Sequence, residues 1–300
     1  MAFKKSRESL SSRAFDVFIN IFMFFVMIIM LYPFLNVIAM SLSSNDYLML
    51  GQVTFYPKGL NLKAYKMVYD DPLVWKAYLN TILYAAGSVV ATLSSTALLA
   101  YPLSIDEFKG KKLITIYLTI TMFFGGGMVP TYLWIRQLGL LNTYWVMILP
   151  GCVSAYNVFV FRTFFKGIAK EMRESAYIDG ANDVVILVKI TLPLSKALFA
   201  TFALFSIVGT WNSWFNALIY LNDERSYPLQ LILRRYLFNA MDGIGGTVSQ
   251  EQQMMLQQLH INPKSVRMAI IVIAMLPITF MYPFLQKYFV KGVALGSVKG

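Results

Sequence analysis

Residues 17–40 read VFINIFMFFVMIIMLYPFLNVIAM and contain no charged side chain. An α-helix needs about 20 predominantly apolar residues to cross the hydrocarbon core of a membrane. A basic N-terminal stretch precedes this run, as it does in signal peptides, but the apolar core of a signal peptide is only about 7 to 15 residues long. The segment therefore predicts a transmembrane anchor that stays in the protein.

The rest of the chain repeats this pattern. Of the 300 residues, 57% are hydrophobic and 14% are charged, whereas a soluble domain carries about 25% charged residues. No linker or strong internal repeat divides the sequence. We therefore predict an all-α polytopic membrane protein, with a single membrane-spanning domain over residues 1–300 and six transmembrane helices. The predicted spans are 17–40, 77–103, 113–135, 143–161, 197–221 and 268–286.

Lysine and arginine predict the orientation. The N-terminus and the segments 104–112, 162–196 and 287–300 together hold 16 of the 26 basic residues, although they are the shorter group of connections. The side richer in Lys and Arg is normally cytoplasmic. We expect both termini inside and the loops 41–76 and 222–267 outside. The net charge of +11 then reflects membrane orientation, and no nucleic-acid partner is expected.

The predicted spans contain no Asp, Glu, Lys, Arg or His. Secondary carriers and ion channels usually keep ionisable groups inside the membrane, so a secondary sugar carrier is disfavoured. The sequence also lacks a G-x-x-x-x-G-K-[ST] phosphate loop and an H-E-x-x-H helix. Cys152 and His260 stand alone and cannot form a metal cluster. We expect no metal site, no cofactor and no enzymatic activity in this chain.

Polar but uncharged residues and helix breakers remain within the spans. Gly125–Gly127 with Pro130, and Pro150 with Gly151, interrupt the third and fourth spans. Such breaks are tolerated where the freed backbone lines a cavity, although small residues also permit plain close packing of helices. The sequence leaves both readings open.

The fifth span contains SIVGTWNSWFNALIYL (206–221), in which Asn212 and Asn216 are predicted to share one helix face. Amides and aromatic rings suit the hydroxyls and C–H faces of a sugar. An interfacial aromatic belt with asparagines joining helices is the alternative. The candidate substrate-path residues are Asn80, Trp211, Asn212, Trp214 and Asn216.

A charged elbow lies between the fourth and fifth spans. AKEMRESAYIDG (169–180) predicts a short helix ended by Gly180, since glycine adopts the left-handed conformation easily. Asn182 or Asp183 can cap a second helix, which Pro193 is expected to stop. Small residues at the tip (Ser175, Ala176 and Ala181) suit insertion into a partner's groove, whereas a helix pair resting on lipid headgroups is the alternative.

The motifs ESAYIDGA (174–181) and ITLP (190–193), with nine residues between Gly180 and Ile190, resemble the cytoplasmic coupling loop of importer-type ABC transporter permeases. Ser175 replaces an alanine of that pattern. The stretches GGGMVPTYLWIRQLGLLNTYW (125–145), WNSWFNALIYL (211–221) and the tail 265–300 are similar to the oligosaccharide-uptake branch, which includes maltose-type and polysaccharide-fragment permeases.

The resemblance implies a function. The chain would be the transmembrane subunit of an ATP-driven importer in the bacterial plasma membrane and would form half of an oligosaccharide path with a second permease subunit. A cytoplasmic ABC ATPase dimer would bind ATP and Mg²⁺, and an extracytoplasmic solute-binding protein would deliver the sugar. The implied ATPase-coupling residues, within a loop over about 169–193, are Glu174, Ala176, Asp179, Gly180, Ala181, Leu192 and Pro193.

The outer loop 222–267 contains VSQEQQMMLQQLHINP (248–263), which predicts a short amphipathic helix ending before Pro263. Gln252, Gln253, Gln257 and Gln258 are candidate contacts to the docked binding protein. A helix that merely caps the outer surface is the alternative. For the whole chain, the alternative from another functional class is a membrane scaffold that recruits a cytoplasmic partner without moving solute.

Overall fold

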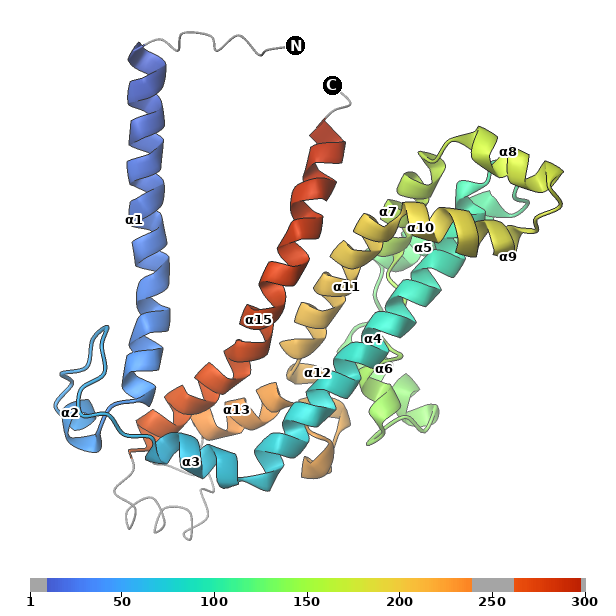
Figure 1. The fold of residues 1–300 in the computed structure, drawn as a ribbon. Coiled ribbons are helices and arrows are strands. Elements are labelled where there is room, and N and C mark those ends of the chain that lie inside the picture. Colours follow the sequence, from blue (N-terminus) through green and yellow to red (C-terminus); the bar gives the residue numbers. More distant parts are fainter. Residues whose placement is uncertain (1–9, 239–261, 298–300) are drawn as a thin grey trace. The chain divides into compact units, whose positions relative to one another are not determined.

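The computed structural model describes residues 10–238 and 262–297, which are mostly helical (Figure 1). Within these ranges the only β-type pairing is an isolated bridge between Ser43 and Leu60, so the all-α prediction is confirmed there. The helices are α1 (Leu10–Ser41), α2 (Asn45–Met49), α3 (Lys63–Asp70), α4 (Pro72–Ser104), α5 (Lys111–Phe123), α6 (Met128–Gln137), η1 (Tyr144–Met147), α7 (Ala155–Lys166), α8 (Lys170–Ile178), α9 (Asp183–Ile186), η2 (Leu187–Thr191), α10 (Leu192–Leu194), α11 (Lys196–Trp211), α12 (Phe215–Tyr220), η3 (Glu224–Ser226), α13 (Leu229–Phe238) and α15 (Pro263–Ser297).

The chain forms two compact units. The first comprises residues up to 70 together with 236–274, and the second comprises 71–235 together with residues from 275 onward. The sequence-based assignment of one membrane-spanning domain stays a prediction.

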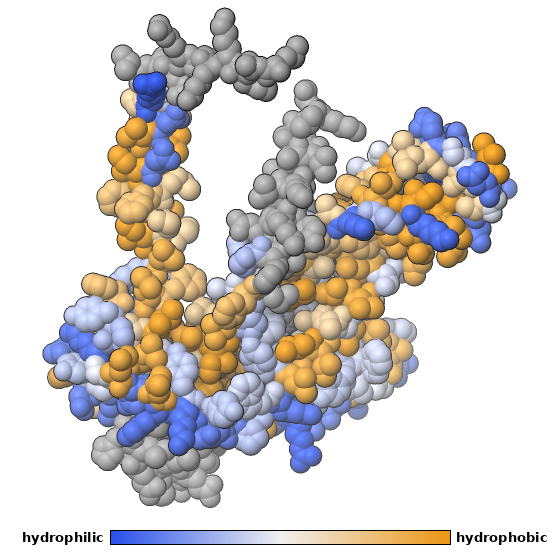
Figure 2. Space-filling view, viewed as in Figure 1, coloured by the Kyte–Doolittle hydropathy of each residue, from blue (hydrophilic) through white to orange (hydrophobic). Residues whose placement is uncertain are grey.

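In the first unit, α1 exposes a nearly continuous hydrophobic surface (Figure 2). Its residues 12–41 are long and apolar enough to cross a membrane. The end of α1 is held by polar contacts, because the hydroxyls of Ser41 and Tyr65 share a hydrogen bond of 2.7 Å. Hydrophobic side chains facing outward along a helix of this length are what a lipid environment requires.

In the second unit, α4 is the central element. Its 33 residues give it a length of about 50 Å, and it packs against α7 and α11. Phe161 of α7 is fully buried between these helices and makes edge-to-face ring contacts with Phe165, Phe199 and Phe202. The aromatic cluster joins α7 to α11.

The described helices agree only partly with the six predicted spans. Three are long and apolar enough to cross a membrane, namely α1, α4 and residues 263–280 of α15, and up to five spans result if two bent pairs count as one each. The predicted break at Pro150 and Gly151 in the fourth span is confirmed, whereas no continuous helix covers 143–161. That segment has a 3-10 turn at Tyr144–Met147, and α7 begins only at Ala155. Pro150 and Gly151 lie in the irregular stretch between them. Proline has no backbone N–H to donate and glycine has a low helix propensity, so neither favours a continuous helix here.

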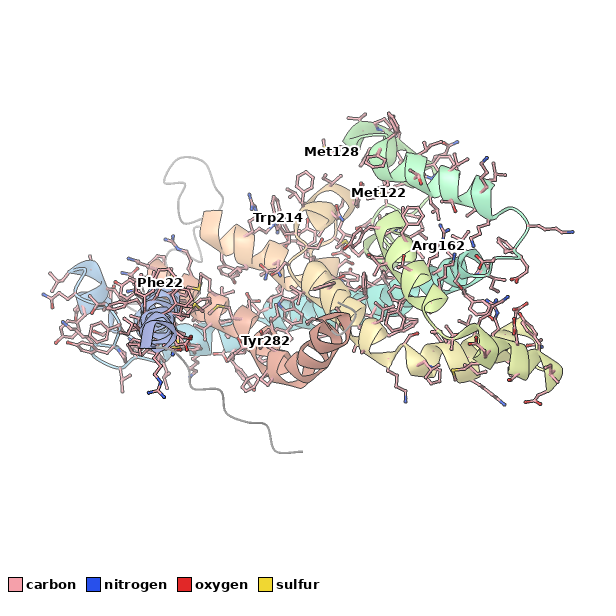
Figure 3. The ribbon with its side chains drawn as sticks, turned by 90° about the horizontal axis from the view of Figure 1, so that it is seen from above. Phe22, Met122, Met128, Arg162, Trp214 and Tyr282 are labelled. Carbon is pink, nitrogen blue, oxygen red and sulfur yellow. The ribbon has the colours of Figure 1, made fainter. Side chains whose placement is uncertain are left out.

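The predicted break in the third span, 113–135, is confirmed. The helix α5 ends at Phe123, Gly127 has a φ of +82°, and α6 starts at Met128. The axes of α5 and α6 differ by 119°. Met122 and Met128 mark the two sides of this break (Figure 3). Three consecutive glycines make helix continuation unfavourable, and the left-handed Gly127 reverses the chain.

Asn142, which the sequence analysis did not single out, joins two loops of the second unit. It has a φ of +57°, a conformation that asparagine tolerates better than most residues. Its Oδ1 accepts from the backbone N–H groups of Asn222 (3.0 Å) and Asp223 (3.1 Å). Its own N–H donates to the Tyr220 carbonyl at 2.9 Å. One side chain thus holds the turn after α6 against the chain that follows α12.

Candidate functional site

The predicted elbow between the fourth and fifth spans is a helix–glycine–helix unit. The helix α8 ends at Ile178, and Gly180 has a φ of +80°. Asn182 is the N-cap of α9, and its Oδ1 accepts from the Val185 N–H at 2.9 Å. The expected left-handed glycine and the expected cap are both confirmed. Each is set by residues within a few positions, which explains why the sequence could predict them.

The second helix ends one residue after Pro193, close to where the sequence predicts its stop. The helical path continues from Asp183 to Leu194 and bends by 80° only at Ser195. The π-helix η2 (Leu187–Thr191) lies directly before the proline. Pro193 has no N–H to donate, and the π turn directly before it leaves room for this loss in the last turn of the helix. Ser195 marks the bend, with its hydroxyl donating to the Thr191 carbonyl at 2.7 Å.

The small residues of the elbow face inward. Ala176 is buried and Ala181 packs against the same hydrophobic core. The expected exposed tip of small residues is therefore wrong for these two alanines, although Ser175 is exposed. Their small size lets α8 and the turn lie close to the helices beneath.

Larger side chains take the exposed positions. Ile178 is 86% exposed and Val184 is 68% exposed, and hydrophobic groups appear among hydrophilic ones at this end of the second unit (Figure 2). The Glu174 carboxylate is also exposed and lies 3.2 Å from the Lys170 ammonium on its own helix. Such an exposed pair contributes little stability, so Glu174 remains accessible to another charge. The loop thus presents apolar side chains beside a carboxylate.

Asp183 ties the elbow to α4. Its Oδ1 accepts from the Tyr177 hydroxyl at 2.5 Å and from the Tyr101 hydroxyl at 3.2 Å. Partial burial, followed by the hydrogen bond to the Asp183 carboxylate, raises the pKa of Tyr177 above its ordinary value. Tyr101 lies 82 residues away in the chain, and this distance explains why the sequence analysis missed the contact.

Ion pairs lie at the same end of α4 as the hydrogen bonds of Asp183. Asp106 contacts Lys111 at 2.9 Å and Lys166 at 3.3 Å. The hydrogen bond to Lys111 is the main cause that lowers the pKa of the Asp106 carboxyl. A second set of pairs joins Glu107 to Arg173 (3.6 Å) and Lys170 (3.9 Å) of α8. The connection between α4 and α5 is thereby held against α7 and α8.

A cavity of about 350 Å³ lies elsewhere in the second unit, among α4, α7, α11 and α12. It includes the backbone breaks at Pro150–Gly151 and at Ser213. Its lining carries no charged side chain, and Tyr156 with Phe205 adds aromatic surface. The polar lining residues are Ser88, Thr92, Asn157, Ser206, Thr210, Ser213 and Asn216. We call this cavity the uncharged pocket.

The predicted path residues divide around this pocket. Asn216 lines it, but Asn212 does not. The expectation that Asn212 and Asn216 share one helix face is wrong, because α11 ends at Trp211 and α12 begins at Phe215. Asn212 is the C-cap of α11 and donates to the Val208 carbonyl at 2.9 Å. Trp214 (Figure 3) lies in the break and stacks under the Arg234 guanidinium, 3.5 Å from the ring centroid.

Asn80 and Trp211 are buried within the second unit. Asn80 is fully buried. Its Nδ2 donates to the carbonyls of Arg225 (2.7 Å) and Tyr227 (3.1 Å), and its Oδ1 accepts from the Tyr144 hydroxyl (2.9 Å). Trp211 is 3% exposed and meets the ring of Tyr78 edge-on. For these two residues the contact with substrate stays a prediction, and in this structure both side chains are buried.

Two further predictions concern the outer loop and metal binding. Gln252, Gln253, Gln257 and Gln258 of the outer loop lie outside the described residues. Within the described ranges, no three His, Cys, Asp or Glu side chains are arranged as metal ligands.

Comparison with known proteins assigns the family. A model described as "Binding-protein-dependent transport system inner membrane component" matches residues 1–295. The chain belongs to this family. Within it, Protein LplC of Bacillus subtilis (strain 168) is 39% identical over 291 residues, which cover 97% of this chain and 96% of LplC. The polygalacturonan/rhamnogalacturonan transport system permease protein YtcP of the same organism is 35% identical, covering 97% and 100%.

A solved structure supports the same conclusion. A chain from the crystal structure of a bacterial ABC transporter involved in the import of the acidic polysaccharide alginate superposes with a TM-score of 0.88 and 32% identity, covering 95% of this permease and 100% of that chain. The predicted resemblance to ABC importer permeases of the oligosaccharide-uptake branch is confirmed. The chain is an integral membrane permease subunit of a binding-protein-dependent importer.

Proposed function

We propose that this permease forms half of the translocation path for an oligosaccharide and that the uncharged pocket contacts the sugar. The observation that carries the proposal is the lining of that pocket, which combines hydroxyls and amides with Tyr156 and Phe205. Hydroxyls and amides can exchange hydrogen bonds with sugar hydroxyls, and aromatic rings can stack on the C–H face of a sugar ring. The relatives whose names or titles give polygalacturonan, rhamnogalacturonan and alginate support a carbohydrate of this kind.

The pocket also indicates which part of the sugar this subunit contacts. Because its lining contains no charged side chain, it offers no ion pair to a uronic-acid carboxylate. The proposed contacts are therefore with hydroxyls and ring faces. A carboxylate on the sugar would be neutralised by the second permease subunit or would stay hydrated.

Two asparagines provide a matched test. Asn216→Leu changes a pocket residue, whereas Asn212→Leu makes the same change in an exposed residue outside the pocket. We expect Asn216→Leu to lower binding-protein-dependent uptake about tenfold, equivalent to one lost hydrogen bond to a sugar, and Asn212→Leu to leave uptake near wild type. Equal uptake by the two variants would contradict a sugar-contacting pocket. A thermal-shift screen of the cognate binding protein identifies the oligosaccharide to use.

The second part of the proposal concerns energy coupling. We infer that the loop from Glu174 to Pro193 docks in a cleft of a cytoplasmic ABC ATPase dimer, which holds ATP and Mg²⁺. The exposed Ile178 and Val184 would be buried on docking, and Glu174 would pair with a basic group of the cleft. Gly180 and Asp179 shape the turn. Ala176 and Ala181 position the loop by close packing on the permease itself.

Charge reversal on α8 tests this coupling. Glu174→Lys should abolish co-purification of the ATPase and its stimulation by sugar-loaded binding protein, because attraction becomes repulsion in the docked cleft. Glu171→Lys changes another exposed carboxylate of the same helix and should retain most of both. A wild-type level of ATPase association in Glu174→Lys would sink the assignment. The scaffold alternative predicts a bound partner without ATPase stimulation or uptake.

The proposed orientation places the elbow and both termini in the cytoplasm. In a Cys152→Ser background, Lys109→Cys and Asn182→Cys should be shielded from an impermeant thiol reagent in intact cells. Lys66→Cys, in the proposed outer loop, should react. All three positions are exposed, so labelling reports the side of the membrane rather than burial. Reaction of position 182 from outside would reverse the topology.

The outer loop is proposed to meet the solute-binding protein through Gln252, Gln253, Gln257 and Gln258. Deletion of residues 252–258 should leave assembly and basal ATPase activity unchanged and should reduce the stimulation given by sugar-loaded binding protein. Unchanged stimulation would indicate a capping segment instead.

A further inference from the structure

A groove between the start of α5 and the end of α7 gathers positive charge. Its volume is about 530 Å³, and its lining includes Lys111, Lys112, Thr115 and Arg162 together with the apolar Phe108 and Ile116. We call it the basic groove. The lining contains three cations and no carboxylate. It is separate from the uncharged pocket and from the coupling loop.

Arg162 is the partly buried cation of the groove that has no carboxylate partner among the described residues. It is partly buried on α7 (Figure 3), and its hydrogen-bond partner is the Thr115 hydroxyl at 3.4 Å. Within the described part of the chain no carboxylate lies within ion-pair distance of Arg162 or Lys112, whereas Lys111 is paired with Asp106. A partly buried guanidinium without an anionic partner is costly. The groove therefore has a surplus of positive charge that an anion would neutralise.

The surroundings of the groove indicate where that anion comes from. On a neighbouring face of the same helix, α5 exposes Leu113 (74%), Tyr117 (66%) and Ile120 (52%). These side chains suit the acyl chains of a lipid, and the basic residues at the start of the helix lie where headgroups would be. A planar guanidinium can bind two phosphate oxygens at once. Basic pockets between transmembrane helices on the cytoplasmic side are typical headgroup sites.

We propose that the basic groove binds the phosphodiester headgroup of an anionic phospholipid, with Arg162 and Lys112 as the principal contacts. Arg162 contacts the phosphate between α5 and α7, and the Lys112 ammonium contacts it from the start of α5. The acyl chains lie along the exposed face of α5. The lipid would join two helices that the protein itself connects here only through the long Arg162–Thr115 hydrogen bond and apolar packing.

Lipid retention tests the site without requiring transport, so a failed transport assay and a failed lipid assay are distinguishable. The importer complex is purified from nanodiscs that contain phosphatidylglycerol and phosphatidylcholine, and the retained lipids are counted by native mass spectrometry. Arg162→Gln and Lys112→Gln should each weaken phosphatidylglycerol retention about fivefold, as expected for the loss of one charge near an anionic headgroup. Lys66→Gln, a matched loss of charge at an exposed position far along the chain, should retain wild-type levels.

Two further arms complete the test. Arg162→Lys keeps the charge and should recover part of the retention, which separates a lost headgroup contact from a folding defect. Soluble glycerol phosphate, added in detergent, should not displace the bound lipid. Equal retention in Arg162→Gln and Lys66→Gln, equal preference for phosphatidylcholine, or displacement by glycerol phosphate would each overturn the proposal.

Discussion

The two ends of α4 are held by different kinds of interaction. Near its start, buried neutral groups predominate: Asn80 and Tyr84 bond to backbone carbonyls of residues 225–227, and Thr81 accepts from the Leu229 N–H at 2.8 Å. Near its end, exposed charges predominate, with Asp106 and Glu107 paired to lysines and Arg173. The first end is a buried amide-and-hydroxyl network, and the second is a charged surface around the coupling loop.

Because of this difference, the two ends of α4 should respond differently to substitution. A buried polar group without its partner costs about 1 to 3 kcal/mol, whereas an exposed ion pair contributes about 0 to 1 kcal/mol. The start of α4 should therefore tolerate little change. The coupling end can exchange its partners when another protein docks, because little intramolecular free energy is lost there.

The largest expected effect is at Asn80. Asn80→Ala removes three hydrogen bonds and leaves the carbonyls of Arg225 and Tyr227 without this donor. We expect a loss of roughly 3 kcal/mol in the free energy of unfolding, measured by denaturation of the detergent-solubilised protein. Asn212→Ala, which removes an exposed amide bonded within its own turn, should change stability by less than about 0.5 kcal/mol. Similar losses in the two variants would remove the proposed contrast.

The next effect is at Gly180. A Cβ built on Gly180 meets no atom within 4 Å, yet its φ is +80°. Gly180→Val should therefore introduce backbone strain of about 1 to 2 kcal/mol without a clash. The variant should insert and retain global stability while losing ATPase association. Gly125→Val, also in open space but without a positive φ, is the control and should associate normally. An associated, active Gly180→Val complex would mean that the loop geometry is not needed.

A smaller effect is expected at the tie between the elbow and α4. Tyr177→Phe and Asp183→Asn each weaken the 2.5 Å hydrogen bond, and a double-mutant cycle should give an interaction free energy of about 1 kcal/mol. Hydrogen exchange over residues 177–186 should rise in both variants. Tyr47→Phe, in the first unit, should leave that exchange unchanged. Additive effects of the two changes would show that the contact does not hold the loop.

The smallest effect concerns pH. Lys111 and Lys166 lower the pKa of Asp106 below its ordinary value of 3.8. A lowered native pKa adds stability that is present above the ordinary value and is lost as the pH falls through the native one. Asp106→Asn should therefore lower the free energy of unfolding slightly at neutral pH and leave it unchanged at strongly acidic pH. A stability difference that persists unchanged down to pH 2 would exclude the ion pairs as its cause.

The sequence predicted features that depend on neighbouring residues. Membrane character follows from the hydrophobicity of segments such as 17–40. The turn at Gly180, the cap at Asn182 and the break at Gly125–Gly127 were predicted correctly because each reflects the backbone preference of one to three residues. The family resemblance rested on the same kind of local motif and is confirmed.

Only the tertiary structure decided which polar and aromatic residues face a cavity. Asn80 and Asn216 are both amides in apolar segments, but Asn80 is buried against carbonyls about 145 residues away, whereas Asn216 lines the uncharged pocket. Ala176 faces the core and Ile178 faces outward, opposite to what their sizes suggested. Hydropathy and spacing describe a residue and its near neighbours, whereas burial and hydrogen bonding depend on which distant segments the fold brings beside it.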